Sequence, residues 1–401
     1  MNILFLAPRL PLPADTGGKI RTLNILKQLS KENRVYLLCF TFEDLDRIHA
    51  QTIRELGIEV HMVPIVEPSI IQKITTIIFN SIPFSILKYH TSQMSQSIRQ
   101  VLAEKPFDAI HVDHLHMAMY NDCFKDIPCF LDEHNVEYKI LERCAQVERS
   151  WLKRILYRNQ SQKMIAIESR KVKEFNGVFA CSLEDSLLLK DLAKGQGLVH
   201  VIPNGVDTEY FNIKQEQDGD REDTIVFTGS MDWLPNDDAI SYFCKEILPL
   251  VWQKNNFLKL NVVGKNPSKF VKDLSVRDGR VNVTGRVEDV RPFIEQAKIF
   301  IVPLRIGGGT RLKILEAMAM GKAVISTTIG AEGIACKNGV NISIADSPKD
   351  FAQKIIELCK QPVLAAAMGQ EGRNLVCQEY DWNIVGKKLN AVYQEIVYAS
   401  I

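Results

Sequence analysis

The stretch NILFLAPRLPLPADTGGKIRTLNILKQLSKENRVYLLCF, residues 2–40, joins two apolar runs through a turn and a helix-like segment. The first run, 2–8, leads into a turn rich in proline and glycine. The second run, 34–40, follows the segment 22–32, in which apolar residues recur at helical spacing. Strand, loop, helix and strand in this order are the opening unit of a doubly wound parallel sheet.

The same alternation continues along the chain. Further apolar runs of strand length lie at 58–65, 107–113, 127–133, 177–182, 199–205, 224–230, 258–264, 281–285, 299–304 and 323–328. The segment NIKQEQDGDRED, residues 212–223, is polar and is the best linker in the chain. We therefore predict an α/β fold with two doubly wound, Rossmann-like domains facing each other across a cleft. We place the domains at 1–205 and 206–380, and we expect a helix in 381–401 to pack back toward the first domain.

Composition limits the functional classes. The chain has 401 residues, of which 24% are charged, and a formal net charge of +1. A dedicated nucleic-acid-binding protein would normally show a basic excess, so we predict no nucleic acid among the partners. The nine cysteines form no C-x-x-C pair, which argues against a zinc ribbon or a thioredoxin-type site. An odd cysteine count, no secretory leader and no apolar run of about 20 residues favour the cytoplasm.

Ligands of doubly wound sheets bind beyond the carboxyl ends of the strands. TGGKI, residues 16–20, lies at such a point after the first strand. Gly17 and Gly18 would let the backbone approach a ligand, and the N–H groups of the following helix would hold an anion. A turn that simply needs glycine is an equally good interpretation of two adjacent glycines.

GGGTRLKILEAM, residues 307–318, lies at the matching point in the second half. Its glycines free backbone amides, a helix N-terminus is partly positive, and Arg311 and Lys313 add formal charge. Neither the Walker A spacing nor G-x-G-x-x-G occurs here, but a nucleotide diphosphate held by amides and cations fits. Glu316 would meet sugar hydroxyls or, alternatively, be a solvated helix acid. The predicted donor contacts in this stretch are Gly308, Gly309, Thr310, Arg311, Lys313 and Glu316.

Polar side chains follow two strands of the first half. AIHVDHLHMAMY, residues 109–120, carries His111, Asp113, His114 and His116, and DEHNVEY, residues 132–138, carries Asp132, Glu133, His134 and Glu137. Such clusters supply acid–base groups or hydrogen bonds to a sugar, although ordinary loop polarity is an equally good interpretation of any single residue. We predict that Asp113 and His114 are catalytic and that His134 and Asn135 bind the acceptor.

The D-x-D pairs Asp44–Asp46 and Asp218–Asp220 lie beside a helix start and in the linker, and neither is a convincing metal site. We predict no metal and no cofactor.

The segment 149–173 is rich in Arg and Lys with interleaved apolar residues. A helix lying on an anionic membrane surface is one interpretation, and an ordinary amphipathic surface helix is the favoured one. The apolar segment 69–87 leaves the same choice between membrane contact and buried helices.

The chain resembles the retaining glycosyltransferases of family 4, which have the two-domain GT-B fold. The resemblance covers nearly the whole chain. It rests on TGGKI (16–20), VIPNGVDTEYF (201–211), VTGRVEDV (283–290) and LKILEAMAMGKAVISTTIGAEGI (312–334). The PNGVD and LEAMAMGKAVIST pieces together are specific to the family.

The resemblance implies roles by position. Glu316 matches the second glutamate of the family's Glu–seven residues–Glu motif, which binds the ribose of a nucleotide sugar. His114, or Asp113 beside it, falls where relatives place a polar group against the transferred sugar. The remaining implied donor contacts are Gly17 and Gly18 for the phosphates and the reacting sugar, and the loop of Gly285, Arg286 and Val287 for the base.

Two departures from the family pattern matter. The first glutamate of the motif is replaced by Gly308, so sugar recognition must differ. The family's Arg and Lys for the diphosphate should follow the first strand of the second domain, but FTGSMDWLPNDD, residues 227–238, offers only Gly229 toward the donor and no cation. We expect Arg311 and Lys313 to supply that charge from the other side of the phosphates, because a diphosphate leaving group needs charge compensation.

The resemblance thus implies a retaining, metal-independent hexosyltransferase that uses a nucleotide-diphosphate sugar. The first domain would bind a glycan or lipid-linked acceptor for a surface polysaccharide, and the second would bind the donor. The protein would be cytoplasmic, either free or in peripheral contact with the inner face of the plasma membrane. Two alternatives stay open: a nucleotide-sugar 2-epimerase of the same architecture, and a non-catalytic nucleotide-sugar-binding protein, for which Gly308 is the hint.

Overall fold

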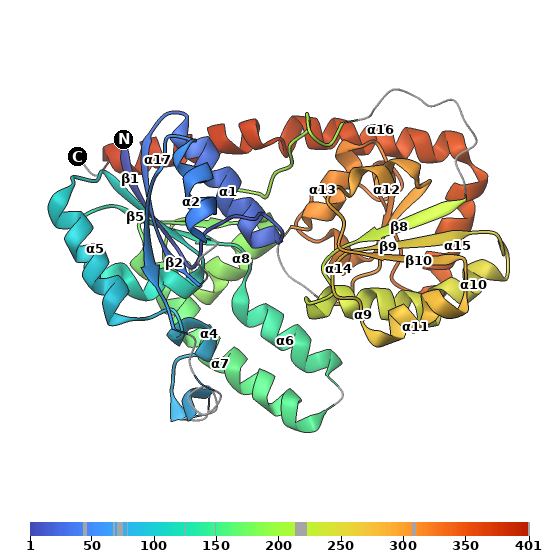
Figure 1. Ribbon diagram of the computed structural model, residues 1–401, viewed down its shortest axis with the longest axis horizontal. Coiled ribbons are helices and arrows are strands. Elements are labelled where there is room, and N and C mark those ends of the chain that lie inside the picture. Colours follow the sequence, from blue (N-terminus) through green and yellow to red (C-terminus); the bar gives the residue numbers. More distant parts are fainter. Residues whose placement is uncertain are drawn as a thin grey trace. The chain divides into compact units, whose positions relative to one another are not determined.

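The computed structural model describes residues 1–42, 46–66, 69, 75–77, 79–124, 126–148, 150–212, 223–306 and 310–399. The chain forms two compact units (Figure 1). Unit 1 consists of Met1–Pro203 and Val385–Ile401, and unit 2 of Asn204–Ile384. The sequence-based boundaries, 205 and 380, lie close to these. Each unit has its own buried apolar core around a parallel sheet.

The sheet of unit 1 has the strand order β3-β2-β1-β4-β5-β6-β7, and all its described pairings are parallel. Its strands are β1 (Asn2–Ala7), β2 (Arg34–Thr41), β3 (Glu59–Pro64), β4 (Ala109–Asp113), β5 (Cys129–Glu133), β6 (Gly177–Ala180) and β7 (Val199–Val201). Every residue of β4, β5 and β6 is buried, as expected for central strands covered on both faces. Their few polar side chains therefore need partners inside the protein.

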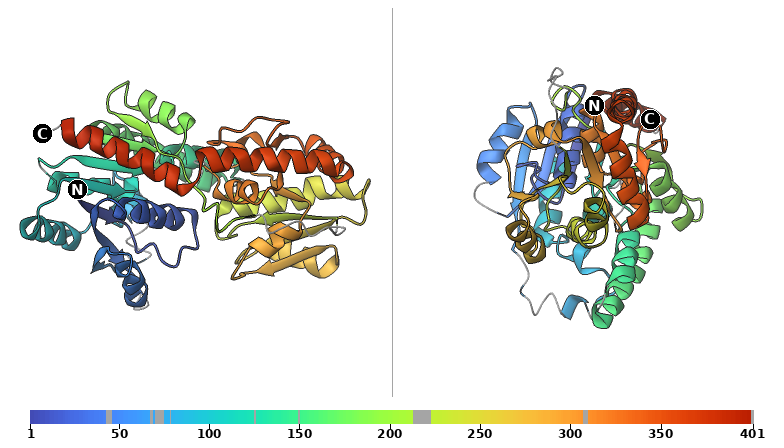
Figure 2. Two further views of the ribbon diagram at one scale, coloured as in Figure 1. Left: turned by 90° about the horizontal axis from the view of Figure 1, so that it is seen from above. Right: turned by 90° about the vertical axis from the view of Figure 1, so that its right-hand side faces the viewer.

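The helices of unit 1 are α1 (Gly17–Ser30), α2 (Asp46–Arg54), α4 (Phe84–Leu87), α5 (Ser92–Glu104), the 3-10 helix η1 (Leu115–Cys123), α6 (Glu137–Val147), α7 (Trp151–Glu174) and α8 (Leu183–Leu192). The final helix α17 (Trp382–Ala399) belongs to unit 1 from Val385 on (Figure 2). There Tyr393 packs against His111 of β4.

Helix α1 differs from the prediction of a helix over 22–32, because it begins at Gly17. Thr16 is the extended N-cap residue, and the Ile20 amide donates to the Thr16 carbonyl at 2.9 Å. Glycine normally weakens a helix by about 1 kcal/mol. Gly18 is favoured at this position because there is little space for a side chain: a β-carbon on Gly18 would lie 3.2 Å from His114 Nε2. The glycine loop expected from the sequence is therefore the first turn of the helix.

The sheet of unit 2 has the parallel order β10-β9-β8-β11-β12-β13. Its strands are β8 (Thr224–Thr228), β9 (Lys259–Val263), β10 (Val281–Gly285), β11 (Ile299–Val302), β12 (Ala323–Ser326) and β13 (Ser343–Ile344). Its helices are α9 (Leu234–Tyr242), the π-helical turn η2 (Phe243–Ile247), α10 (Leu248–Trp252), α11 (Lys269–Arg277), α12 (Arg291–Gln296), α13 (Leu312–Ala319), α14 (Thr328–Ala331), α15 (Pro348–Lys360) and α16 (Pro362–Glu379). The α/β class with two doubly wound sheets is confirmed.

The helical segment after β8 in unit 2 is divided into α9, η2 and α10. Pro249 lies in the first turn of α10 and has no N–H to donate to the preceding turn, which accounts for the interruption. Among the described helices of both units, none combines the length and the apolar character that crossing a bilayer requires.

Candidate functional site

Two buried carboxylates lie opposite each other at the ends of neighbouring strands of unit 1, Asp113 on β4 and Asp132 on β5. Asp132 is held by Arg21 of α1, whose Nη2 donates to its Oδ1 at 2.6 Å and whose Nε donates to its Oδ2 at 3.0 Å. Arg21 is only 1% exposed and also donates to the carbonyls of Ile202 and Pro203 at 3.0 and 3.1 Å. The guanidinium thus fixes α1 to β5 and to the loop after β7.

Asp113 accepts three hydrogen bonds. The donors are Thr22 Oγ1 at 2.8 Å, His114 Nδ1 at 2.9 Å and His134 Nε2 at 2.8 Å. Burial alone would raise the pKa of Asp113, but the two histidines hold it well below its usual value. Asp132 lies 3.5 Å from the same His134 nitrogen. Burial would lower the pKa of His134, but the two carboxylates raise it to about 9, so this histidine carries a proton at neutral pH.

His114 is the residue of this network that a ligand can reach, because its side chain is 19% exposed. Burial, followed by the charge of His134, lowers its pKa, so His114 is neutral at pH 7. Its Nδ1–H donates to Asp113, which leaves Nε2 as the acceptor nitrogen, next to Gly18. Its backbone has φ 69°, an uncommon conformation for a residue with a side chain. Its ring centre lies 3.5 Å from that of His134.

The other histidines of the predicted cluster have separate roles. His111 Nδ1 lies 2.6 Å from the Tyr393 hydroxyl, and its ring stacks on Phe5. Burial lowers the pKa of His111 to about 4, so it is a neutral core residue. His116 packs edge-on against Tyr89. The structure therefore brings Asp113, His114 and His134 together, with half-buried Asn135 following in the chain, and leaves His116 outside this network.

The acids that follow Asp132 also separate. Glu168 of α7 accepts hydrogen bonds from the backbone amides of Glu137 and Tyr138 at 2.7 and 3.1 Å, and so caps the start of α6. Burial raises the pKa of Glu168 to about 8 and that of Glu137 to about 7. Burial together with these neighbouring acids raises the pKa of Glu133 well above its usual value. Glu168 thus stabilises the start of α6 and is not part of the histidine network.

Within the described residues, two overlapping triplets are spaced for a metal ion: Asp113, His114 and His134, and His111, Asp113 and Asp132. In the first triplet both histidines already hydrogen-bond to Asp113, so an ion would have to displace those bonds. The expectation that no metal is needed stays a prediction.

In unit 2, Lys313 of α13 reaches the loop after β8. Its Nζ donates to Asn236 Oδ1 at 2.8 Å and lies 4.3 Å from the centre of the Phe227 ring. Gly229, with φ 154°, follows β8, and a β-carbon there would lie 2.6 Å from Lys313 Nζ. Burial, followed by the charge of Arg311, lowers the pKa of Lys313 to about 7. Residues 227–238 contain no Lys or Arg, but the ammonium group of Lys313 thus lies beside them.

The other described residues of the predicted phosphate loop lie at the start of α13 and within it. Arg311 is the N-cap residue of α13, and Thr310 donates to the Gly333 carbonyl at 3.3 Å. Glu316 lies three residues after Lys313, and burial raises its pKa to about 7 despite that lysine. Gly308 and Gly309 lie outside the described residues.

The loop predicted to contact the base follows β10. Gly285 has φ 69°, Arg286 is exposed, and Val287 packs on the apolar core of unit 2. Gly264, after β9, has φ 156°, and a β-carbon there would overlap the Gly229 carbonyl oxygen at 1.9 Å. The loops after β8, β9 and β10 and the start of α13 therefore all lie at the carboxyl edge of one sheet.

Sequence patterns missed four residues of these networks: Arg21, Thr22, Tyr393 and Asn236. Arg21 and Thr22 follow Gly17 and Gly18 by four residues each, which is about one helical turn. A helix started at Gly17 would have placed them on the same face as the glycines. Tyr393 and Asn236 gave no signal of their own.

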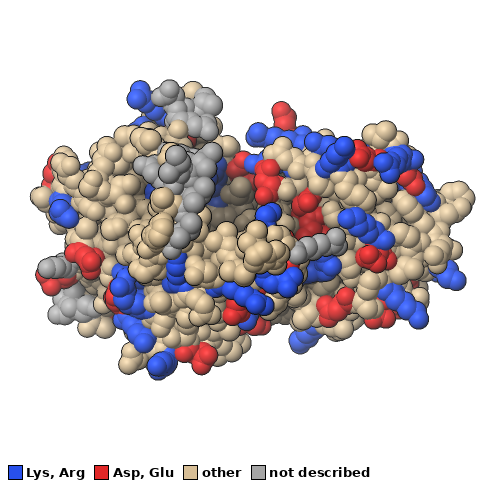
Figure 3. Space-filling model, turned by 90° about the horizontal axis from the view of Figure 1, so that it is seen from below, with Lys and Arg blue, Asp and Glu red and all other residues tan. Residues whose placement is uncertain are grey.

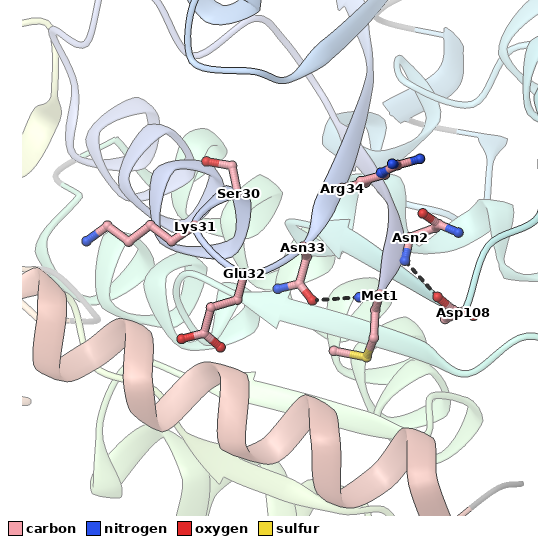
Figure 4. A pocket seen from close by; sticks show the side chains of 8 residues that line it. All are labelled: Met1, Asn2, Ser30, Lys31, Glu32, Asn33, Arg34 and Asp108. Atoms are coloured by element: carbon pink, nitrogen blue, oxygen red, sulfur yellow. Dashed lines mark hydrogen bonds between the residues drawn. The ribbon is translucent and has the colours of Figure 1, made fainter.

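The opposite edge of the unit 1 sheet holds a hollow of about 520 Å³ near the N-terminus (Figure 4). There the Asn2 amide donates to Asp108 Oδ2 at 2.7 Å, and the N-terminal amine donates to Asn33 Oδ1 at 3.3 Å. The hollow lies at the amino ends of β1 and β2 and contains none of the predicted site residues. On the face drawn in Figure 3, Lys and Arg are mixed with Asp and Glu, in keeping with the net charge of +1.

Two protein families match the chain. Residues 16–210 match the family described as Glycosyltransferase Family 4, and residues 222–361 match the family described as Glycosyl transferases group 1. Together these matches extend over most of both units.

Individual relatives are distant. The chain is 25% identical over 376 residues to an uncharacterized 44.6 kDa protein in the cps region of Klebsiella pneumoniae, covering 90% of this chain and 91% of that protein. It is 28% identical over 213 residues to a GDP-mannose-dependent monoacylated alpha-(1-6)-phosphatidylinositol monomannoside mannosyltransferase of Corynebacterium glutamicum, covering 48% of this chain and 55% of that enzyme. This second match thus spans about half of the mannosyltransferase.

Among solved structures, Anabaena HepE in complex with UDP superposes with a TM-score of 0.72 at 13% identity, over 98% of this chain and 100% of that one. At this level of identity the likeness shows the shared fold alone.

Proposed function

Since this chain belongs to glycosyltransferase family 4 and has the GT-B fold, we propose that it transfers a hexose from a nucleotide-diphosphate sugar to a hydroxyl group of a glycan or lipid-linked acceptor, with retention of anomeric configuration and without a metal ion. A role in surface-polysaccharide synthesis and peripheral contact with the inner face of the plasma membrane belong to the same proposal and rest on the family resemblance.

The observation that carries the proposal is the position of Lys313. Its ammonium group lies beside Gly229, at the loop where the family's diphosphate-binding cations are missing, and it bonds to the neutral Asn236. A lysine whose pKa burial lowers to about 7 is costly to keep charged without an anion. Binding of a diphosphate would supply a negative counter-charge to Lys313. The pKa of Lys313 would then rise, and the side chain would take up a proton.

In the proposed reaction the bond between the sugar C1 and the β-phosphate oxygen breaks, and its electron pair stays on the diphosphate. The acceptor oxygen bonds to C1, and its proton passes to the β-phosphate oxygen that departs. Lys313 and Arg311 stabilise the leaving diphosphate, which is the kind of charge stabilisation that contributes most to transfer catalysis. Glu316 accepts hydrogen bonds from the ribose, and the Arg286–Val287 loop faces the base.

Unit 1 supplies the groups for the sugar and the acceptor. His114 presents a neutral imidazole whose Nε2 accepts a hydrogen bond from a hydroxyl, while Asp113 and the charged His134 fix its orientation. Asn135 faces the acceptor side in this proposal, and the buried His134, predicted to bind the acceptor, acts through Asp113 and His114. Both His114 and His134 are hydrogen-bonded to Asp113 before the substrate arrives. These side chains therefore need little reorganisation during the reaction.

A screen of UDP-, GDP- and ADP-sugars for thermal stabilisation tests donor binding first, because a ligand that binds only the folded state raises its stability. The names of relatives mention GDP-mannose and UDP, so both bases are included. Turnover is then followed with and without an acceptor and with a chelator, and the product anomer is assigned by NMR.

The outcomes separate the alternatives. Turnover that needs an acceptor and survives the chelator supports the proposal, whereas sugar isomerisation without an acceptor identifies an epimerase. Binding without any turnover identifies a non-catalytic protein. An Arg311→Ala/Lys313→Ala double variant with normal donor affinity and turnover would refute the proposed charge replacement.

A further inference from the structure

The first part of helix α7 projects from unit 1. The helix runs over Trp151–Glu174, but its buried residues begin only at Ser161. The ten residues 151–160, which we call the α7 tip, extend for about 15 Å at the rise of an α-helix and lie beside α6 (Figures 1 and 2). This segment therefore contributes little to the core that stabilises the fold.

The α7 tip nevertheless carries large apolar side chains. Trp151, Leu152 and Ile155 are 67%, 61% and 57% exposed, and Leu156 is 39% exposed. Trp151 and Ile155 are four residues apart, as are Leu152 and Leu156, so the four side chains are neighbours on the helix surface. A contiguous exposed patch of this kind on a folded protein usually marks an interaction site.

The charged side chains in this part of α7 are all basic. Residues 151–166 contain Lys153, Arg154, Arg158 and Lys163 and no Asp or Glu. Arg154 donates to the Glu148 backbone carbonyl at 3.0 Å, and Lys153 and Arg158 are exposed. The partner that complements the α7 tip is therefore apolar at its centre and negatively charged around it.

We propose that the α7 tip binds the surface of an anionic lipid bilayer. Trp151, Leu152 and Ile155 lie at the boundary between headgroups and acyl chains, and the basic side chains contact lipid phosphates. Tryptophan favours this boundary, and basic residues near it attract anionic lipids. A second copy of the chain fits less well, because pairing two such tips would bring like charges together.

This surface deepens the proposed function, since it would hold the enzyme at the membrane that carries a lipid-linked acceptor. It rests on that function only for its purpose, because vesicle binding requires neither donor nor transfer. A protein that binds vesicles but transfers no sugar would contradict the proposed function alone. A protein that transfers sugar to a soluble acceptor but ignores vesicles would contradict the membrane surface alone.

Flotation of the full chain with phosphatidylcholine vesicles, with and without phosphatidylglycerol, tests the surface directly. We expect binding only with phosphatidylglycerol present and a decrease of binding with added salt. The variant Trp151→Ser/Leu152→Ser/Ile155→Ser loses at least about tenfold in vesicle affinity. The variant Lys153→Gln/Arg158→Gln loses about tenfold or more and binds with less dependence on salt.

The matched control is Phe257→Ser/Val276→Ser/Val363→Ser in unit 2, whose side chains are 78%, 86% and 83% exposed. It should bind vesicles as the parent chain does. Brominated lipids should quench the fluorescence of Trp151, and Trp151→Phe should abolish that quenching while vesicle binding persists.

Three results would overturn the proposal. They are equal vesicle binding by the parent and both α7 variants, binding that does not depend on phosphatidylglycerol, and an analytical ultracentrifugation result in which the serine variant converts a dimer to a monomer. The charge variant changes only exposed side chains, so it remains informative if the serine variant folds poorly.

Discussion

The two units place ionisable groups at the carboxyl edges of their sheets in different ways. In unit 1 the buried charges are paired with one another: Arg21 with Asp132, and His134 with Asp113. In unit 2 the half-buried Lys313 donates to a neutral amide. A paired network is complete before a ligand arrives, whereas a cation beside a neutral partner gains most when an anion binds.

This difference predicts a division of labour. The unit 1 network holds His114 in one protonation state and one orientation, so its effect should be on the chemical step. The unit 2 lysine should act on the affinity for the donor as well as on the departure of the diphosphate. Substitutions of Lys313 should therefore weaken donor binding, and substitutions in the unit 1 network should not.

The largest effect should come from removing the buried charge of unit 1. Arg21→Met leaves Asp132 buried without its guanidinium partner, and breaking a buried ion pair costs about 3–5 kcal/mol of the free energy of unfolding. Lys313→Met should cost nothing or raise stability, because it removes a desolvated cation. Urea denaturation measures the free energy of unfolding of both variants. Equal losses of stability would show that the two units do not differ in how they hold their buried charges.

The next effect concerns turnover. His114→Ala should lower kcat about 100-fold, within the range of a positioned polar group, with donor affinity nearly unchanged. His134→Gln keeps a donor toward Asp113 but removes the charge and should lower kcat less. Steady-state kinetics with calorimetric donor affinities checks the split. A change confined to donor affinity would mean that His114 acts on the donor, as we propose for Lys313 of unit 2.

The protonated His134 of unit 1 should make the stability of the protein depend on pH. The folded-state pKa of His134 is raised to about 9, above its unfolded value, so its contribution to stability is complete below about pH 6.5 and is lost as the pH rises through 9. The slope in that range is at most about 1.4 kcal/mol per pH unit. His134→Gln should remove it in urea titrations at several pH values. An unchanged slope would show that His134 is neutral in the folded protein.

The sequence predicted the positions of these sites because polar residues directly follow buried apolar runs. AIHVDH and FLDEH end parallel strands, and parallel strands bring their carboxyl ends to one edge. Asp113 and His134 could therefore be placed near each other from the sequence pattern. The α13 residues were placed in the same way, from an apolar run followed by glycines and cations.

The partners could not be predicted, because they depend on strand order. Arg21 and Asp132 are 111 positions apart, and they meet because β1, β4 and β5 are neighbours in the sheet. Lys313 reaches Asn236, 77 positions earlier, because β8 lies beside β11. The start of α1 was misplaced because two glycines disfavour a helix locally, while the close approach of His114 favours a glycine at position 18. Strand β13 has two residues, too few for a periodic pattern.

The most direct test of the central claim, that a cation on α13 replaces those missing after β8, is calorimetric titration of UDP and GDP into three proteins. They are the parent chain, Lys313→Met, and the control Lys298→Met, whose lysine pairs with Asp223 at 2.5 Å at the other edge of the same sheet. We expect a loss of about tenfold or more in affinity for the better nucleotide with Lys313→Met, and none with Lys298→Met. Above pH 7 the parent chain should also take up a proton on binding, and Lys313→Arg should not, because arginine stays charged. Equal affinities of the parent chain and Lys313→Met would contradict the claim.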